Sequence, residues 1–131
     1  MIGLDTNVLV RFLVEDDVEQ TARAAAFVRK AAAKGEPLFV SDVVLCEVVW
    51  VLARAYSFSR DVLAAALRRL LSARQLTFAD ADVLDRALTS YGSGRGDFAD
   101  YVIREHAREA GCRSVATFDR ALLKEDGFER P

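Results

Sequence analysis

The sequence predicts an α/β fold, in which parallel strands form a central sheet with helices on both of its faces. Short apolar runs without amphipathic alternation, typical of buried strands, alternate with longer segments whose apolar residues recur at helical spacing. Helices separate successive strands, and this order brings the strands together in parallel. The 131 residues contain no repeat, linker or low-complexity tract, so we expect one domain over residues 1–131.

The first apolar run, residues 1–4, predicts a buried central strand that ends at Asp5. Thr6 and Asn7 are suited to cap a following helix over residues 8–14. Ligands of open α/β sheets bind at the carboxyl ends of the strands, so Asp5 is a candidate functional acid. The alternative is that Asp5 merely caps the helix that follows.

Residues 16–34 predict a second helix that ends at Gly35, and residues 38–40 predict the second strand. Ser41 is a good N-cap for the next helix, residues 42–54, which is apolar on every side and is therefore expected to be buried on most of them.

Glu47 is the one carboxylate in the middle of that apolar helix. An ionised acid in a core costs several kcal/mol unless a partner compensates, which favours a ligand that a rigid helix points at a cation. The alternatives are a salt bridge to a neighbouring arginine and a position on a narrow exposed stripe.

The second half of the sequence continues the alternation of helices and strands. It predicts, in order, a helix over 59–73, a strand over 75–78, a helix around 83–88, a glycine-rich loop over 91–96, a helix over 97–110, a strand over 113–117 and a tail over 120–131. We expect one or two helical turns and then a loose end in the tail. Arg95, in the middle of the glycine-rich loop, is placed to meet an anionic substrate.

Three further acids accompany the last helix and the last strand. Asp97 begins the helix and is a candidate N-cap, whereas Asp100, one turn further along the same side, has less need to be a cap. Asp119 follows the last strand, and we expect it at the same sheet edge as Asp5. Carboxylates gathered there would repel one another, and one or two Mg²⁺ or Mn²⁺ ions would remove that conflict.

Composition limits the classes of function. A net charge of −2 argues against a protein that holds nucleic acid by overall positive charge, but it allows one that handles a short stretch of backbone through bound metal ions. No segment is apolar over the roughly 20 residues of a membrane span, and Met1 leads directly into the first predicted strand. We therefore expect no membrane association, no signal peptide and a cytoplasmic location.

The usual side-chain nucleophiles are absent from the predicted site. Cys46 and Cys112 lack a Cys or His at metal-ligand spacing, and we expect reduced thiols that are buried or half-buried. His106 is expected to be solvated on a helix surface. Metal-bound water is therefore the nucleophile that this chain offers.

Four segments, taken in order, resemble the PIN-domain family and, within it, the VapC-type ribonuclease toxins of bacterial toxin–antitoxin pairs. The segments are Asp5-Thr6-Asn7-Val8-Leu9, then Ser41 followed by Glu47-Val48-Val49-Trp50-Val51-Leu52, then Asp97-Phe98-Ala99-Asp100-Tyr101-Val102-Ile103, and Val115-Ala116-Thr117-Phe118-Asp119. No single motif is diagnostic, but the ordered set covers essentially the whole chain. The resemblance implies a PIN-like three-layer α/β/α sandwich with a central parallel sheet of four or five short strands.

The resemblance also implies a metal-dependent endoribonuclease that hydrolyses RNA phosphodiester bonds with metal-activated water. Asp5 and Asp100 would be the principal ligands of Mg²⁺ or Mn²⁺, and Glu47 and Asp119 would complete the site directly or through water. Asp97 is a co-ligand or an outer acid, and the choice between Asp97 and Asp100 stays open. Residues that would support the site by hydrogen bonding are Thr6, Asn7 and Thr117.

The expected partners are single-stranded or loop RNA, a cognate antitoxin protein and a second copy of the chain in a homodimer. The alternatives are an RNA-processing PIN nuclease that is not a toxin, a non-catalytic RNA- or protein-binding PIN-like module, and a phosphohydrolase with an aspartyl nucleophile. The last usually needs a second acid two residues after the first, where this chain has Asn7. A receiver-type signalling domain fits less well, because the middle of the chain lacks the aspartate that it would phosphorylate.

Overall fold

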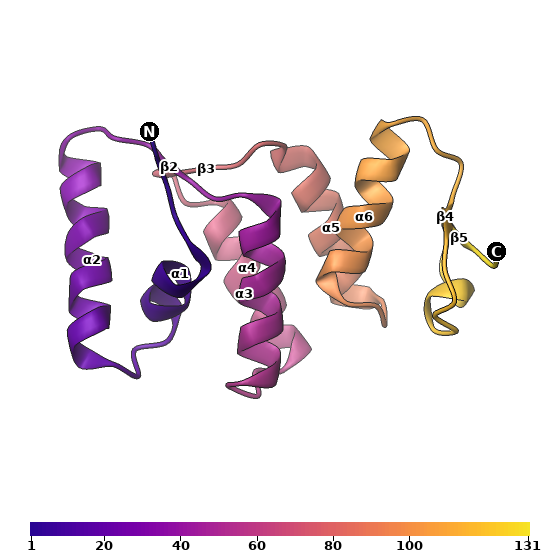
Figure 1. Ribbon diagram of the computed structural model, residues 1–131, viewed down its shortest axis with the longest axis horizontal. Coiled ribbons are helices and arrows are strands. Elements are labelled where there is room, and N and C mark those ends of the chain that lie inside the picture. The colour runs from indigo at the N-terminus through magenta and orange to yellow at the C-terminus, as the bar shows by residue number, and fades with distance from the viewer. The chain divides into compact units, whose positions relative to one another are not determined.

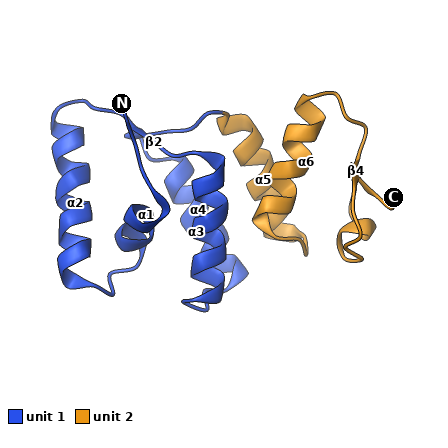
Figure 2. Cartoon of the chain, in the orientation of Figure 1, with its two compact units in different colours: residues 1–79 blue, residues 80–131 orange.

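The computed structural model describes residues 1–131 and confirms the α/β class, with short strands set between helices (Figure 1). Internal contacts divide the chain into two compact units, Met1–Ala79 and Asp80–Pro131 (Figure 2). No helix in the chain has both the length and the apolar character needed to cross a membrane.

Unit 1 contains a parallel three-stranded sheet and four helices. Its elements are β1 (Ile2–Gly3), α1 (Thr6–Leu13), α2 (Val18–Ala33), β2 (Leu38–Phe39), α3 (Asp42–Arg54), α4 (Arg60–Leu71) and β3 (Leu76–Thr77). The strand order is β1-β2-β3, with Ile2 opposite Leu38 and Phe39 opposite Thr77. The central strand of this sheet is thus β2, and the prediction that residues 1–4 form the central strand is wrong.

The first strand is also less buried than its sequence predicts. Met1 is 69% exposed and Ile2 40%, whereas Leu38 of β2 is completely buried. Strand β1 has a hydrogen-bonded neighbour on one side only, so part of its surface remains in water. Leu4, directly after the strand, is buried and joins the core.

Helix α3 buries one face and exposes another, so the prediction of burial on most sides is wrong. Ser41 caps the helix as expected, because its hydroxyl oxygen accepts a hydrogen bond from the amide of Val44. Leu45, Val48, Val49 and Leu52 form the buried face, whereas Val43 is 68% exposed and Trp50 58%. Val43 and Trp50 therefore place apolar side chains in solvent at two turns of this helix. The sequence pattern does not show which apolar side chains of the helix are exposed.

Unit 2 contains two helices that pack against each other and one pair of parallel strands. Its elements are α5 (Ala81–Ser93), α6 (Phe98–Glu109), β4 (Val115–Ala116), a 3₁₀ turn η1 (Leu122–Lys124) and β5 (Phe128–Glu129). The core between α5 and α6 includes Val83, Leu84, Phe98 and Tyr101.

The carboxyl-terminal segment forms a strand, so the predicted loose end is wrong. Strand β5 pairs in parallel with β4, with Val115 opposite Phe128. Gly127 makes the approach to β5 possible with a positive φ of 89°, a conformation that favours glycine. The structure has five strands, within the four or five expected, and all pair in parallel, but they form one sheet of three strands and one of two in place of a single central sheet.

The structure confirms the predictions for Cys46 and His106 but not the predicted burial of Cys112. Both cysteines are free thiols, and Cys46 is half-buried as expected. Cys112 is exposed, which corrects the expectation that it would be at least partly covered. His106 lies on the exposed side of α6, as the sequence predicts.

Candidate functional site

Asp5 is the N-cap of α1. Its Oδ1 accepts a hydrogen bond of 2.8 Å from the amide of Thr6, and its backbone is extended, as a cap requires. Helix α1 starts at Thr6, so the prediction that Thr6 and Asn7 precede the helix and cap it is wrong. Asp5 itself is exposed two residues after the end of β1, where its carboxylate is accessible to a ligand.

Thr6 and Glu47 join α1 to α3. The buried hydroxyl group of Thr6 donates a hydrogen bond of 2.6 Å to Oε2 of Glu47. Glu47 is exposed, because it lies on the same side of α3 as Val43 and Trp50, and it makes no ion pair. The predicted cost of burying this carboxylate therefore does not arise, and the alternative of an exposed stripe describes its position.

Asn7 is exposed and lines a pocket of about 440 Å³ in unit 1. The pocket lies between the start of α1 and the face of α2, and it includes Gly3, Leu4, Val8, Arg11, Gln20, Arg23, Ala24 and Phe27. Arg11 is held there by hydrogen bonds to Gln20 and Asp16. Asn7 thus borders a mainly apolar pocket, one edge of which lies two residues from Asp5 in the sequence.

Asp97 and Asp100 form a capping arrangement at the start of α6. The amide of Asp97, the N-cap, donates a hydrogen bond of 2.8 Å to Oδ2 of Asp100. Asp100 is therefore part of the cap, which corrects the expectation that it had less need to be one. Burial raises the pKa of Asp100, and the negative charges of Asp97, Asp119 and Glu125 raise it further, against the opposing hydrogen bond from the Asp97 backbone.

Asp119 lies in a turn that its own side chain stabilises. Its amide donates to Oγ1 of Thr117 at 3.0 Å, and its Oδ1 accepts from the amides of Ala121 and Leu122. The side chain is exposed, and it is close enough to Asp100 to act on the pKa of that carboxyl group. Unit 2 therefore brings together three of the predicted acids, Asp97, Asp100 and Asp119.

Glu125 is a fourth acid of this group that the sequence reasoning missed. Its carboxylate accepts hydrogen bonds of 2.7 and 2.8 Å from the hydroxyl group of Tyr101, and its Oε2 accepts from the amide of Arg95. Arg95 and Lys124 line a pocket of about 360 Å³ beside it. Glu125 lies in residues 120–131, for which the sequence predicts a loose end and no role in the site.

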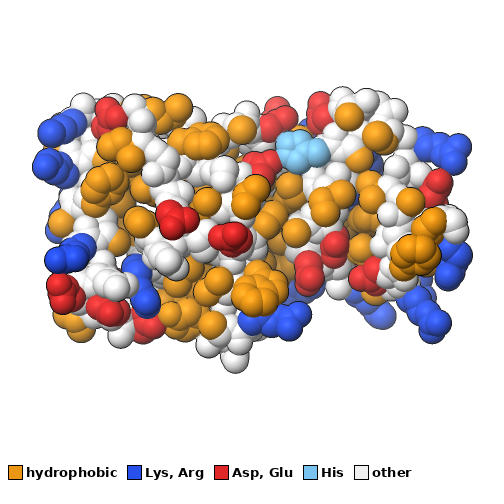
Figure 3. All heavy atoms as spheres, in the orientation of Figure 1, with side chains coloured by type: hydrophobic (Ala, Val, Ile, Leu, Met, Phe, Trp, Pro, Cys, Tyr) orange, Lys and Arg blue, Asp and Glu red, His pale blue; other side chains and the backbone are white.

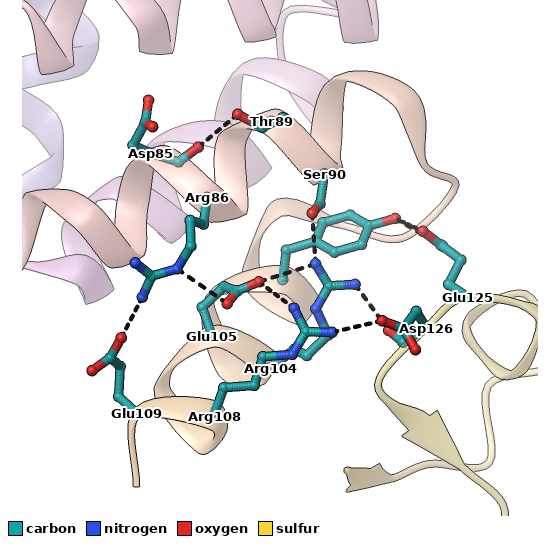
Figure 4. Close-up of polar contacts among 11 residues, drawn as sticks. Asp85, Arg86, Thr89, Ser90, Arg104, Glu105, Arg108, Glu109, Glu125 and Asp126 are labelled. Atoms are coloured by element: carbon teal, nitrogen blue, oxygen red, sulfur yellow. Dashed lines mark hydrogen bonds and ion pairs between the residues drawn. The ribbon is translucent and has the colours of Figure 1, made fainter. Parts of the chain in front are cut away.

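A buried ion cluster anchors α6, the helix that carries Asp97 and Asp100 (Figure 4). Glu105 is 2% exposed and pairs with Arg86, Arg104 and Arg108, at 3.4, 3.2 and 3.0 Å. Arg104 also donates to the backbone carbonyl of Asp126, which precedes β5. These contacts connect α6 with α5 and with the carboxyl-terminal strand.

The predicted acids thus form two groups, Asp5 with Glu47 in unit 1 and Asp97, Asp100 and Asp119 in unit 2. Neither unit alone arranges three His, Cys, Asp or Glu side chains in a way that would hold a metal ion. The three acids of unit 2 offer carboxylate oxygens, the ligands that a hard divalent cation prefers, and the negative charges of Asp97 and Asp119 act on Asp100.

Comparison with known proteins identifies the family. The chain matches the family model described as PIN domain over residues 2–127, a range that includes parts of both units and all of the predicted acids. It is also similar to the VapC ribonuclease of Aquifex aeolicus (strain VF5), with 27% identity over 121 residues, which cover 92% of this chain and 89% of that protein. Because the match spans nearly its whole length, the chain belongs to the PIN domain family.

Proposed function

We propose that this protein is a metal-dependent endoribonuclease of the VapC type and the toxin of a toxin–antitoxin pair. The observation that carries the proposal is the match to the PIN domain over residues 2–127, together with the similarity to a VapC ribonuclease along 92% of the chain. The substrate would be single-stranded or loop RNA, whose backbone enters a crevice that a duplex cannot enter.

The proposed metal ligands are the acids of both units, Asp5, Glu47, Asp97, Asp100 and Asp119. They would hold one or two Mg²⁺ or Mn²⁺ ions, with Asp5 and Asp100 as the principal ligands. When bound, such ions polarise the phosphate and lower the pKa of a coordinated water molecule. The raised pKa of Asp100 supports a cation at this position, since a positive charge would offset the repulsion from Asp97 and Asp119.

The remaining residues would orient these acids. Thr6 fixes Oε2 of Glu47 through its hydroxyl group, and Thr117 holds the turn that presents Asp119. Glu47 or Asp119 would accept the proton of the attacking water molecule. Asn7 would support the substrate side of the pocket that it lines, and Arg95 would bind an RNA phosphate.

The proposal includes two protein partners. A cognate antitoxin would cover the acids and silence the enzyme, and a second copy of the chain would form a homodimer. Growth arrest on expression, relieved by a small gene encoded beside this one, would support the toxin assignment. Cleavage of RNA without growth arrest would instead indicate an RNA-processing nuclease of the same family.

The decisive experiment compares the wild-type protein with Asp5→Asn and Asp17→Asn on a panel of tRNAs and rRNA fragments, with added Mn²⁺ or Mg²⁺. Asp17 caps α2 as Asp5 caps α1, through a hydrogen bond from Gln20, so Asp17→Asn is a matched control for the change in capping and charge. We expect Asp5→Asn to lose cleavage by about 100-fold or more while Asp17→Asn retains it. Full activity of Asp5→Asn, or RNA binding by the wild type without any cleavage when Mn²⁺ or Mg²⁺ is added, would overturn the proposal.

A further inference from the structure

We propose that the ring of Phe118 is a stacking platform for one unpaired base of single-stranded RNA, beside the proposed metal ligand Asp119. The inference rests on the proposed function and extends it, because it assigns a place to a nucleotide next to the acids. It depends on three observations, namely the exposure of the ring, the fixed turn that carries it and the basic side chains near it.

Phe118 is 82% exposed, the highest exposure among the large apolar side chains of unit 2. Phe98 and Tyr101 of the same unit are almost completely buried, and Ile103 is 55% exposed. Single apolar side chains on a surface are common and need no explanation on their own. The position of this ring, directly before a proposed ligand, is what distinguishes it.

The turn that carries Phe118 is held by one hydrogen bond that spans this residue and by two that follow it in the sequence. The amide of Asp119 donates to Oγ1 of Thr117, and Oδ1 of Asp119 accepts from the amides of Ala121 and Leu122. The ring and the carboxylate therefore extend from neighbouring residues of one ordered turn. A base stacked on the ring would keep its own phosphates within reach of Asp119, at little cost in ordering the protein.

Basic side chains near this turn match the charge of an RNA backbone. Arg120 follows Asp119, and Arg95 and Lys124 line the pocket of about 360 Å³ that also includes Ala121. None of the three side chains makes an ion pair. On the face of unit 2 shown in Figure 3, acidic side chains and apolar groups are bordered by lysine and arginine side chains.

A nucleotide fits this surface better than an apolar protein segment does. Docking of an apolar partner needs a contiguous apolar area, but the sequence neighbours of Phe118 are Thr117, Asp119 and Arg120. An isolated aromatic ring with arginine and lysine side chains nearby is the combination that binds single strands without a strict sequence preference, because every base has a stacking face.

The test measures binding of two probes in EDTA, where no cleavage occurs. The first is a fluorescein-labelled single-stranded RNA, followed by fluorescence anisotropy, and the second is inorganic polyphosphate, which has the charge of a backbone but no bases and is measured by competition. The proteins are the wild type, Phe118→Ala, Phe118→Leu, Phe118→Tyr, Lys124→Ala and the control Ile103→Ala. Thermal unfolding checks that each variant is folded. Phe118 and Ile103 are both exposed, so we expect substitutions there to leave the fold intact.

We expect Phe118→Ala and Phe118→Leu to raise the Kd for RNA by about 5- to 100-fold, the range for loss of one stacked base. Phe118→Tyr should stay within about twofold of wild type, because it keeps an aromatic face. Ile103→Ala should bind RNA as the wild type does. Polyphosphate should bind the Phe118 and Ile103 variants as tightly as it binds the wild type, whereas Lys124→Ala should weaken the binding of both probes.

Failure of this inference can be told from failure of the proposed function. If the wild type cleaves RNA with Mn²⁺ but Phe118→Ala or Phe118→Leu binds RNA as tightly as it does, the nuclease assignment stands and the stacking platform is wrong. Equal weakening of both probes by Phe118→Ala, or a changed oligomeric state in light scattering, would also overturn the platform. If the wild type neither binds nor cleaves RNA, the proposed function is wrong and the inference with it.

Discussion

The hydroxyl group of Thr6 donates a hydrogen bond of 2.6 Å to Oε2 of Glu47 and so connects the first turn of α1 with the exposed side of α3. Thr6 is buried and Glu47 is exposed, so the donor belongs to the core while the acceptor faces outward. The hydrogen bond thus restricts the orientation of a carboxylate that water would otherwise leave free to rotate.

Thr6→Val removes this donor and keeps the shape of the side chain. We expect cleavage and Mn²⁺ affinity to fall by about 10- to 100-fold, the usual effect of losing a residue that orients a metal ligand. Stability should change by about 1 kcal/mol or less, because water can solvate the exposed Glu47. Thr6→Ser, which restores the hydroxyl group, should recover most of the activity. Isothermal titration with Mn²⁺ measures the affinity, and unchanged affinity in Thr6→Val would contradict the assignment.

Asp100→Asn should stabilise the metal-free fold at neutral pH while it abolishes cleavage. The pKa of Asp100 is raised in the folded state, so its ionised form costs free energy of folding above that pKa. The cost disappears as the pH falls below the ordinary aspartate pKa, where the carboxyl group is neutral in both states. Asparagine can still accept the hydrogen bond from the Asp97 amide.

The measurement for Asp100→Asn is urea unfolding in EDTA at neutral and at acidic pH. The variant should gain stability relative to wild type at neutral pH, and the difference should shrink in acid. A destabilisation of the same size at both pH values would show that the charge of Asp100 is not what matters for the fold.

Gly94→Ala should destabilise the protein, whereas Gly92→Ala should not. A Cβ atom at Gly94 would overlap the hydroxyl oxygen of Tyr101, which is fixed by hydrogen bonds with Gly96 and Glu125. Relief of that overlap should cost about 1–3 kcal/mol. Gly92 lies in α5 with no atom within 4 Å of an added Cβ, so Gly92→Ala should stabilise by up to about 1 kcal/mol. Thermal unfolding of both variants checks the prediction, and equal effects would contradict it.

Glu105→Gln should be among the most destabilising single changes in unit 2. The side chain of Glu105 is 3% exposed and pairs with three arginines, and its loss leaves the buried guanidinium group of Arg104 without this carboxylate, at a cost of about 3 kcal/mol. Glu109 also pairs with Arg86 but is 55% exposed, and Glu109→Gln should cost less than about 1 kcal/mol. Denaturant unfolding measures the stability of both variants. Similar losses of stability for Glu105→Gln and Glu109→Gln would mean that burial does not determine the strength of this cluster.

Local signals in the sequence predicted much of the fold. Ser41 was expected to cap α3 and does so, because a cap depends on residues within one turn. The parallel pairing of strands followed from the alternation of elements, as did the α/β class. The pairing of β5 with β4 did not, since it depends on contacts between distant segments and on the turn at Gly127.

The candidate acids were identifiable from the sequence, but their environments were not. Glu47 was expected in a core because its helix is rich in apolar residues, yet Val43 and Trp50 share its exposed side. The capping role of Asp100 was missed because the residue pattern does not show which carboxylate accepts the Asp97 amide. That all five acids act on one metal site stays a prediction, which the Asp5→Asn experiment tests.

The division of the acids between the two units has a consequence for protein synthesis. During translation, Asp5 and Glu47 leave the ribosome with unit 1, Met1–Ala79, before Asp97, Asp100 and Asp119 of unit 2 are made. Amino-terminal segments fold first as a chain is synthesised. Under the proposed function, a nascent toxin would therefore remain harmless to the RNA around it until unit 2 has been made, which leaves time for an antitoxin to be made alongside it.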